Sequence, residues 1–225
     1  MRHAIFAGFV LTCLGGAAGH AESPWYLSGS VGGYFREGDS GPVTITNHII
    51  TAPGTLKESY DPGIIANLAL GYRLSARFRV ELEAGYAEYQ AATVNPSSAP
   101  FPTLRGQDFN RQSGGQSRRD MGTVNVFYDL PIAGQFVPYV GGGIGGEHGE
   151  LTRAVFADAN GNRFDQSGGE STRGVAVVEG GVTITLSPAF AVVPAYRYLR
   201  IFGGGAGFNA SEAAHIVKLG LRYTF

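Results

Sequence analysis

The sequence has almost no cysteine, and this excludes one common means of stabilising an exported protein. Cys13 is the only thiol in 225 residues, so the chain cannot form an internal disulfide and its stability has to come from other sources. A bacterial lipoprotein would use such a cysteine as its acylated first residue. Thr12, which precedes it, fits that processing site poorly, and the apolar run around it would be cut short.

The sequence also lacks long apolar runs and a charge excess. Past the first two dozen residues, no run approaches the ~20 apolar residues that a membrane-spanning helix needs. Charged residues make up only 16% of the chain and the formal net charge is −1, which gives no indication of a nucleic-acid partner. In their place are 35 glycines and an aromatic content of 12%. Strong helix formers are scarce beside this amount of glycine.

The N-terminus has the three parts of a secretory signal peptide. Arg2 supplies the positive start, residues 4 to 14 form an apolar run, and residues 15 to 21 are rich in small side chains. Cleavage after Ala21, with Gly19 at the third position back, fits the small-x-small rule for signal peptides. We therefore expect residues 1–21 to be a leader and residues 22–225 to form one domain.

The last eleven residues alternate strictly between apolar and polar positions. A strand points successive side chains to opposite faces, so this segment would have one apolar face and one face with two cations. The apolar face carries Val217, Leu219, Leu221, Tyr223 and Phe225, and the opposite face carries Lys218, Gly220, Arg222 and Thr224. An uncovered edge strand pairs with whatever is available. We expect this strand to close a barrel against the first strand.

Eight segments along the chain have this alternating character and reach the ~9 to 11 residues of a tilted spanning strand. They are Trp25 to Arg36, Gly63 to Leu74, Phe78 to Tyr89, Asp120 to Leu130, Phe136 to Glu147, Gly174 to Leu186, Phe190 to Phe202 and Ala213 to Phe225. Short and long connections alternate between them. This predicts an all-β fold, an eight-stranded antiparallel transmembrane up-and-down β-barrel with short periplasmic turns and long extracellular loops. Within one long connection, Val43 to Thr51 either prolongs a strand or forms a hairpin above the membrane.

The charged residues of these segments fall on one face. They are Arg73, Arg79, Glu81, Glu83, Asp129, Glu179, Arg197, Lys218 and Arg222. A soluble barrel would keep its apolar faces inside. Against that alternative, large apolar residues gather at the short-turn ends, as a lipid-interface girdle requires. Eight strands leave an interior just wide enough for side chains, so we expect the charges to form a lumen network that plugs the barrel.

Several stretches resemble the small outer-membrane β-barrel family, the opacity-protein and OmpA/OmpX-like porin-family surface proteins. The stretches are the leader, Pro138 to Gly145, Pro194 to Tyr198, and the terminal Tyr223-x-Phe225. The resemblance covers the chain after the leader and implies a Gram-negative outer-membrane location among lipid and lipopolysaccharide. It also implies that the barrel-assembly machinery reads the apolar face of the last strand. We expect the protein to lack the soluble peptidoglycan-binding domain of longer OmpA proteins.

Two motifs with a chemical meaning are better explained by structure. Gly141-x-Gly143-x-x-Gly146 matches the dinucleotide fingerprint, but that fingerprint needs a helix after the strand and an acid about twenty residues on. Close strand packing or a lumen cavity explains these glycines better. Asp158-x-Asn160-x-Asn162 starts like a calcium loop, yet the sixth position is Arg163 where that loop has glycine. A turn at a loop tip is the favoured reading.

The sequence gives little support to an enzymatic function. Lipid A deacylases and palmitoyl transferases occur on eight-stranded outer-membrane barrels, and a deacylase would place a histidine and a serine two apart on one strand. His48, His148 and His215 have no serine at that spacing. We therefore expect no enzyme activity, no cofactor and no metal site.

The long connections are the expected functional surface, because loops carry recognition while the barrel holds them in place. Arg105, Arg111, Arg118 and Arg119 give one of them a mild cationic excess that could contact lipopolysaccharide phosphates. The favoured function is a structural and interaction protein, with a host or surface ligand left open. A small-solute channel is the alternative, since the glycines of the fifth segment could leave a water path.

Overall fold

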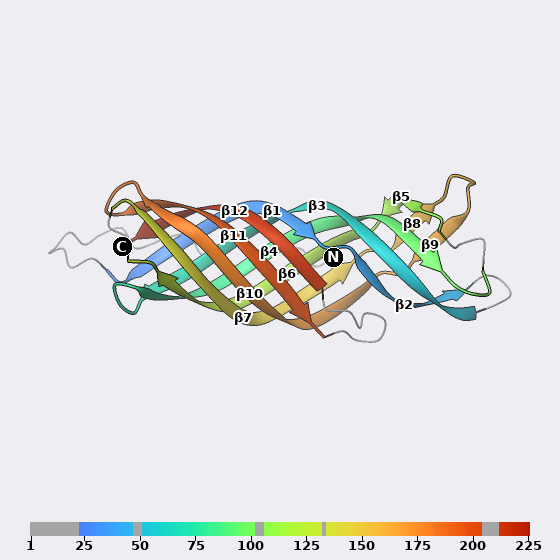
Figure 1. Ribbon diagram of the computed structural model, residues 1–225, viewed down its shortest axis with the longest axis horizontal. Coiled ribbons are helices and arrows are strands. Elements are labelled where there is room, and N and C mark those ends of the chain that lie inside the picture. Colours follow the sequence, from blue (N-terminus) through green and yellow to red (C-terminus); the bar gives the residue numbers. More distant parts are fainter. Residues whose placement is uncertain (1–22, 47–50, 102–105, 132–133, 204–211) are drawn as a thin grey trace, which may run out of the picture.

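The described part of the chain consists of one antiparallel β-sheet. The computed structural model describes residues 23–46, 51–101, 106–131, 134–203 and 212–225, and these ranges contain strands, turns and no helix (Figure 1). Accordingly, none of these ranges supplies a helix of the length and hydropathy needed to cross a membrane. The expected leader, His48 and Arg105 lie outside the described residues.

The sheet has twelve strands, four more than the sequence predicted. They are β1 (Trp25–Arg36), β2 (Asp39–Thr46), β3 (Thr51–Arg73), β4 (Phe78–Ser97), β5 (Phe109–Gly114), β6 (Gln116–Asp129), β7 (Phe136–Leu151), β8 (Ala154–Ala157), β9 (Arg163–Gln166), β10 (Gly169–Thr185), β11 (Phe190–Phe202) and β12 (Glu212–Thr224). Each of the eight predicted segments coincides with, or lies almost wholly within, one strand. The additional strands β2, β5, β8 and β9 lie in the predicted long connections, and β2 includes the first residues of the stretch 43–51.

Eight of the strands close into a ring of pairings. The order β3-β1-β12-β11-β10-β7-β6-β4 returns to its start because β3 also pairs with β4. The predicted pairing of the first and last strands is confirmed, with Tyr26 opposite Thr224 and Tyr34 opposite Ile216. We call this set of eight strands the ring.

The other four strands build a structure at one end of the ring, which we call the extension. β2 pairs with the first residues of β3, and β5 pairs with the end of β4 and with β8, which pairs with β9. Figure 1 shows all four at the end of the molecule opposite the C-terminus. Of the two alternatives for residues 43–51, the hairpin is the one observed: Thr46 pairs with Thr51.

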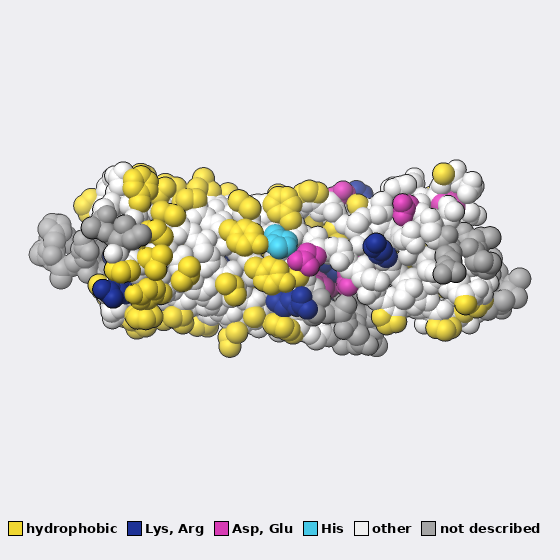
Figure 2. Space-filling model, viewed as in Figure 1, with side chains coloured by type: hydrophobic (Ala, Val, Ile, Leu, Met, Phe, Trp, Pro, Cys, Tyr) yellow, Lys and Arg dark blue, Asp and Glu magenta, His cyan; other side chains and the backbone are white. Residues whose placement is uncertain are grey.

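The ring has an apolar outer surface, and its interior contains charged residues together with an apolar cluster that includes Ile65, Val177 and Ile216. Val31, Ile64, Leu68 and Ile144 are exposed, the last with 71% of its surface accessible, whereas their strand neighbours face inward. Figure 2 shows hydrophobic side chains spread over the part of the molecule that holds the ring and sparse over the extension. The strand faces that carry these large apolar residues point outward, so the alternative of a soluble barrel that keeps its apolar faces inside is wrong.

Aromatic side chains border this apolar surface at both ends of the ring. At the short-turn end the exposed aromatics are Trp25, Phe78, Phe136, Phe190 and Phe225, and toward the extension they are Phe35, Tyr86, Tyr196 and Phe202. Phe78 packs on Tyr128, and Phe190 on Tyr223. Two aromatic girdles that flank an apolar band are the arrangement found at the two interfaces of a membrane.

The extension has an apolar core, to which the ends of the ring strands β3 and β4 contribute. Its interior is an apolar core of Leu56, Ala91, Val94, Phe109, Ala154 and Phe156. Between ring and extension, the pairing of β3 with β4 shifts register at Ser59/Tyr60 and again at Asp61/Ile64. A bulge of this kind moves the following side chains to the other face. These irregularities change which alternate residues of β3 and β4 face inward between the ring and the extension.

Glycines on the inner faces make room for large rings. A Cβ at Gly71 of β3 would overlap the ring atoms of Tyr26, and a Cβ at Gly141 of β7 would overlap Phe127 and the backbone of β6. Aromatic side chains that lie over strand glycines restore the packing that a missing side chain would leave open. The glycine-rich motif of β7 is therefore explained by strand packing, and no helix follows it.

Candidate functional site

The ring interior contains three layers of charged residues. Nearest the short turns is the lower cluster, formed by Arg79, Glu81, Asp129 and Arg222. Arg79 donates to Glu81 at 2.6 Å and to Asp129 at 3.1 Å, and Arg222 lies 3.7 Å from Glu81. The guanidinium of Arg79 also lies over the rings of Phe127 and Tyr139, at 4.3 and 4.4 Å from their centroids. Cation–π contacts of this kind are strengthened by removal from water.

The middle cluster is electrically balanced. It contains two carboxylates, Glu83 and Glu179, and two cations, Arg197 and Lys218, all of them buried. Arg197 bridges the two carboxylates, with 2.9 Å from Nη2 to Glu83 and 2.6 Å from Nε to Glu179. Lys218 lies 2.8 Å from Glu179 and 3.6 Å from Glu83. The four residues come from β4, β10, β11 and β12, so the cluster spans the lumen.

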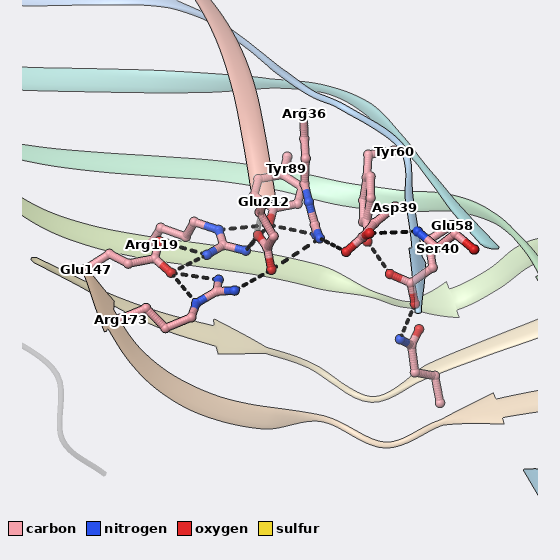
Figure 3. A network of polar contacts seen from close by, with 11 residues as sticks. Arg36, Asp39, Ser40, Glu58, Tyr60, Tyr89, Arg119, Glu147, Arg173 and Glu212 are labelled. Carbon is pink, nitrogen blue, oxygen red and sulfur yellow. Dashed lines mark hydrogen bonds and ion pairs between the residues drawn. The ribbon is translucent and has the colours of Figure 1, made fainter. Parts of the chain in front are cut away.

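The upper cluster lies below the extension and contains three arginines and two glutamates. Arg119 and Arg173 each contact both Glu147 and Glu212 at 2.6 to 2.8 Å. Arg36 lies 3.3 Å from Glu212. Figure 3 shows this network continuing from Arg36 toward Tyr60 and Glu58 of the extension. Because the five side chains come from β1, β6, β7, β10 and β12, they close the lumen at this level.

The structure places the predicted lumen charges as follows. Eight of them lie in the lower and middle clusters: Arg79, Glu81, Glu83, Asp129, Glu179, Arg197, Lys218 and Arg222. Asp129 is the most exposed of these, with 19% of its side chain accessible. Arg73, the last residue of β3, is only half-buried and is not among the buried charges.

The prediction that Arg119 is a loop recognition residue is wrong. The sequence analysis placed it in a long loop, yet it is 4% exposed and lies in the upper cluster. Arg118, its neighbour, faces outward near Glu88 of β4. Arg111 of β5 is half-buried, donates to the carbonyl oxygen of Ala91 at 2.8 Å and lies 3.5 Å from Asp61. Of the four proposed cations, only Arg118 is a largely exposed side chain within the described residues.

The upper cluster was missed because it lies at or just beyond the predicted strand ends. β6, β7 and β10 continue for several residues past the bounds that the sequence suggested. A usable signal was present, since Arg119 and Arg173 keep the alternation of the inner faces of their strands. Arg119 has the phase of Thr123 and Asn125, and Arg173 has the phase of Val175.

The last strand presents its apolar residues to the outside. Val217, Leu219 and Leu221 are 58%, 57% and 52% exposed, and Tyr223 and Phe225 follow on the same face. Arg222, between them, is 3% exposed. The residues proposed as an assembly signal therefore form one continuous outward stripe that ends in two aromatic rings in contact, with 5.4 Å between their centroids.

A cavity of about 370 Å³ lies between the upper cluster and the extension. Its charged lining consists of three arginines and four glutamates: Arg36, Arg119, Arg173, Glu58, Glu150, Glu170 and Glu212. Gln166, Glu170 and the serines and glycines near them form its wall toward β9 and β10. Burial raises the pKa of Tyr60, which also lines the cavity, so this phenol stays protonated and donates to Glu58. The lower and middle clusters enclose only about 20 Å³, which is room for roughly one water molecule.

The other candidate motifs have structural roles. Asp158 accepts from Asn162 Nδ2 at 2.7 Å and from the backbone N–H groups of Asn160 and Asn162. The bond from the Asn162 side chain is the main reason that the pKa of Asp158 is lowered. Gly161 has a φ of 82° in this turn. Within the described residues, no group of three or more His, Cys, Asp or Glu side chains is arranged to hold a metal ion.

The two described histidines face outward. His148 Nδ1 lies 3.2 Å from the hydroxyl of Thr172. His215 lies between Glu37, at 2.9 Å from Nε2, and the hydroxyl of Tyr196, at 2.6 Å from Nδ1. The hydroxyl beside His215 thus belongs to Tyr196, on the outer surface. A deacylase of the expected type would have a serine hydroxyl beside its histidine.

The chain is similar to known proteins. A family model described as outer membrane protein beta-barrel domain matches residues 4–225. An uncharacterized protein of Brucella suis biovar 1 is 25% identical over 244 residues, which cover 91% of this chain and 86% of that protein.

Among solved structures, the outer membrane protein OprG from Pseudomonas aeruginosa is 16% identical with a TM-score of 0.54, and the match covers 91% of this chain and 97% of that chain. Neisserial surface protein A is 18% identical with a TM-score of 0.46, over 92% of this chain and 100% of that chain. At this identity the match to OprG shows a shared fold and nothing about ligands.

Proposed function

The chain belongs to the outer membrane protein β-barrel domain family, and from that membership and its geometry we propose that it is a closed surface barrel with a structural and interaction role. Its location is the outer membrane of a Gram-negative bacterium, so lipid and lipopolysaccharide surround it. The ring of eight strands would be the membrane-spanning barrel. The short turns would face the periplasm and the extension would face the exterior, after removal of residues 1–21 as a leader.

The apolar band between the two aromatic girdles supports the assignment of the ring to the membrane. Side chains such as Leu68, Leu82 and Val178 are more than half exposed, and burying large aliphatic side chains of this kind contributes about 1.5 to 3 kcal/mol each. In water these outward side chains would have no apolar surroundings. Lipid tails supply them over the whole circumference of the ring.

The observation that carries the proposal is the filled lumen. The three charged clusters follow one another along the ring, and the lower and middle clusters leave about 20 Å³ between them. A conducting channel needs a continuous water path of larger width. Buried ion pairs of this kind add little net stability, because desolvation opposes the Coulomb attraction. Their effect here is to fill the barrel with polar side chains that are paired by charge.

The extension supports a role in recognition. Its strands are held by an apolar core that includes Phe109 and Phe156, so the outward end of the molecule has a defined shape instead of free loops. Rigid scaffolds that present connecting segments are the usual basis of surface recognition. Arg118 at the base of the extension would face the lipopolysaccharide layer. We assign no reaction to the protein.

Planar-bilayer recording tests the closed barrel against the channel. We expect the purified protein, inserted at a density at which a general porin gives clear steps, to show no steady unitary currents. Insertion is verified in the same preparation by the heat-dependent shift of the folded band on a gel. Reproducible steps of constant size would overturn the closed barrel and establish the channel as the better function.

A further inference from the structure

An apolar layer crosses the interior of the ring between the middle and the upper cluster. Six strands contribute one large side chain each, and these side chains belong to a single packed cluster. None of them has more than 9% of its surface exposed. The charged lumen is therefore interrupted by a level at which apolar groups pack on one another. We call this group the apolar layer, and its members are Tyr34, Ile65, Met121, Val177, Leu199 and Ile216.

The order of residues along the strands places this layer between two charged levels. In β10, Val177 lies between Arg173 of the upper cluster and Glu179 of the middle cluster. β12 has the same order, with Ile216 between its upper-cluster glutamate and its middle-cluster lysine. Alternate residues of a strand share a face, so these side chains follow one another along the inner face. A path through the lumen therefore has to cross the layer.

The hydrogen-bond networks on the two sides of the layer are separate. Throughout the ranges that the structure describes, no side-chain hydrogen bond or ion pair joins a residue of the upper cluster to one of the middle cluster. The layer itself has one polar side-chain group, the hydroxyl of Tyr34, which is buried and has no hydrogen-bond partner among the described residues. Chains of charged side chains can relay protons through a membrane protein. Here such a chain is interrupted.

Charged clusters and an apolar layer obstruct a lumen by different means. The clusters occupy space, but their donors and acceptors can also hold water and protons. An apolar constriction offers no replacement for the hydrogen bonds that entering water would lose, and constrictions of this kind close channels by dewetting. The layer is thus better suited to stop protons than the clusters on either side of it.

We propose that the apolar layer is the barrier of this barrel to protons and small ions, whereas the charged clusters fill the lumen without sealing it. The proposal rests on the closed barrel proposed above and deepens it, because it assigns the barrier to a defined group of side chains. Polar substitutions in the layer should open the barrel to protons. Removal of charges from the middle cluster should leave it closed.

Proton entry into liposomes that contain the purified barrel and an enclosed pH-sensitive dye provides the test. The layer variant carries Leu199→Ser and Ile216→Ser, and the cluster variant carries Glu83→Gln and Lys218→Gln. The cluster variant loses one charge of each sign and keeps the remaining ion pair of the middle cluster. We expect the layer variant to admit protons at least about tenfold faster than the unaltered protein, because hydroxyl groups let water enter the constriction. The cluster variant should admit them no faster than the unaltered protein.

The outcomes separate this proposal from the closed barrel itself. Fast proton entry through the unaltered protein would overturn the closed barrel and the role of the layer with it. If the unaltered protein is tight and the layer variant is folded but equally tight, only the role of the layer is overturned. Proton entry through the cluster variant would have the same meaning, since its apolar layer is intact.

Leu56→Ser is the matched control, because it makes the same kind of change in the apolar core of the extension. Its rate of proton entry should equal that of the unaltered protein. The heat-dependent gel shift verifies that each variant is folded in the liposomes. If the layer variant does not fold, Leu199→Ser alone takes its place. If that variant also fails to fold, the cluster variant decides: a tight barrel supports the proposal and proton entry contradicts it.

Discussion

Single residues inside the ring are held by several partners at once, so each removal affects more than one pair. Arg197 contacts both carboxylates of the middle cluster, and Lys218 contacts the same two. Loss of one cation would leave two buried glutamates to share the other. Breaking a buried pair by removing one partner is costly because the remaining charge is buried without compensation.

Arg197→Ala should therefore destabilise the barrel by about 3 to 5 kcal/mol. Arg111→Ala, at a half-buried position of the extension, should change the free energy of unfolding by less than about 1 kcal/mol. Urea unfolding of both variants in the same lipid or detergent, followed by tryptophan fluorescence, provides the comparison. Equal midpoints for the two variants would contradict the assignment of Arg197 to the lumen.

Gly71 is a second position where one atom matters. A methyl group there would overlap the ring of Tyr26, so Gly71→Ala should lower stability by about 1 to 3 kcal/mol through overpacking. Gly122→Ala is the matched control, because nothing lies within 4 Å of a Cβ at that exposed strand position. The temperature at which the folded gel band disappears measures the stability of both variants. A control that falls as far as Gly71→Ala would show that glycine content alone matters.

At the scale of the strand, alternation predicted some elements completely and others only in part. The predicted bounds of β1 and β11 are those of the structure, because both strands lie wholly within the ring and keep one phase throughout. β3 and β4 were cut short, since the phase changes at the register shifts near Ser59 and Asp61. A pattern that reverses its phase cannot be followed past the bulge from sequence alone.

Apart from the hairpin at residues 43–51, the extension could not be predicted, for a related reason. Its strands are short, and β8 and β9 have four residues each, which is too few for a period of two to stand out. Their apolar side chains face inward, whereas the ring strands have apolar side chains both outside and in an interior cluster, so one rule for the whole chain fails. The residues of the lower and middle clusters followed from the alternation and those of the upper cluster did not, whereas the cavity depends on how ring and extension meet and had no sequence signal.

The last strand, β12, provides a testable prediction. If the outward stripe that ends in Phe225 is what the assembly machinery recognises, Phe225→Ala should reduce the folded protein in outer membranes of cells by severalfold. Refolding of the purified variant into detergent should be nearly unchanged, because the side chain is half exposed and contributes little to packing. Gel shift assays on both preparations measure this.

Thr224→Ala is the control for that strand, since its side chain belongs to the opposite face. Wild-type amounts of folded Phe225→Ala in cells would remove the residue from the proposed signal. Failure of the same variant to refold in vitro would mean that the Phe225 side chain contributes to stability, which also contradicts a role limited to recognition.

The molecule as a whole has two distinguishable ends, and its orientation can be measured. The extension end includes the turn at Gly161, and the opposite end includes the short turn at Ala76. An epitope inserted after Gly161 should be labelled by antibody on intact cells. The same epitope after Ala76 should be labelled only after the outer membrane is permeabilised. The reverse result would invert the proposed topology.

The seam between β1 and β12 has a kinetic consequence. Because strands from opposite ends of the sequence complete the ring, no partial chain can close it, and every earlier intermediate would have two unpaired edges. Contacts between such distant segments make folding slow, while open edges invite association with other chains. The polypeptide therefore has to be kept apart from its own copies from secretion until its final residue arrives, and a chain truncated before β12 should be degraded or aggregate.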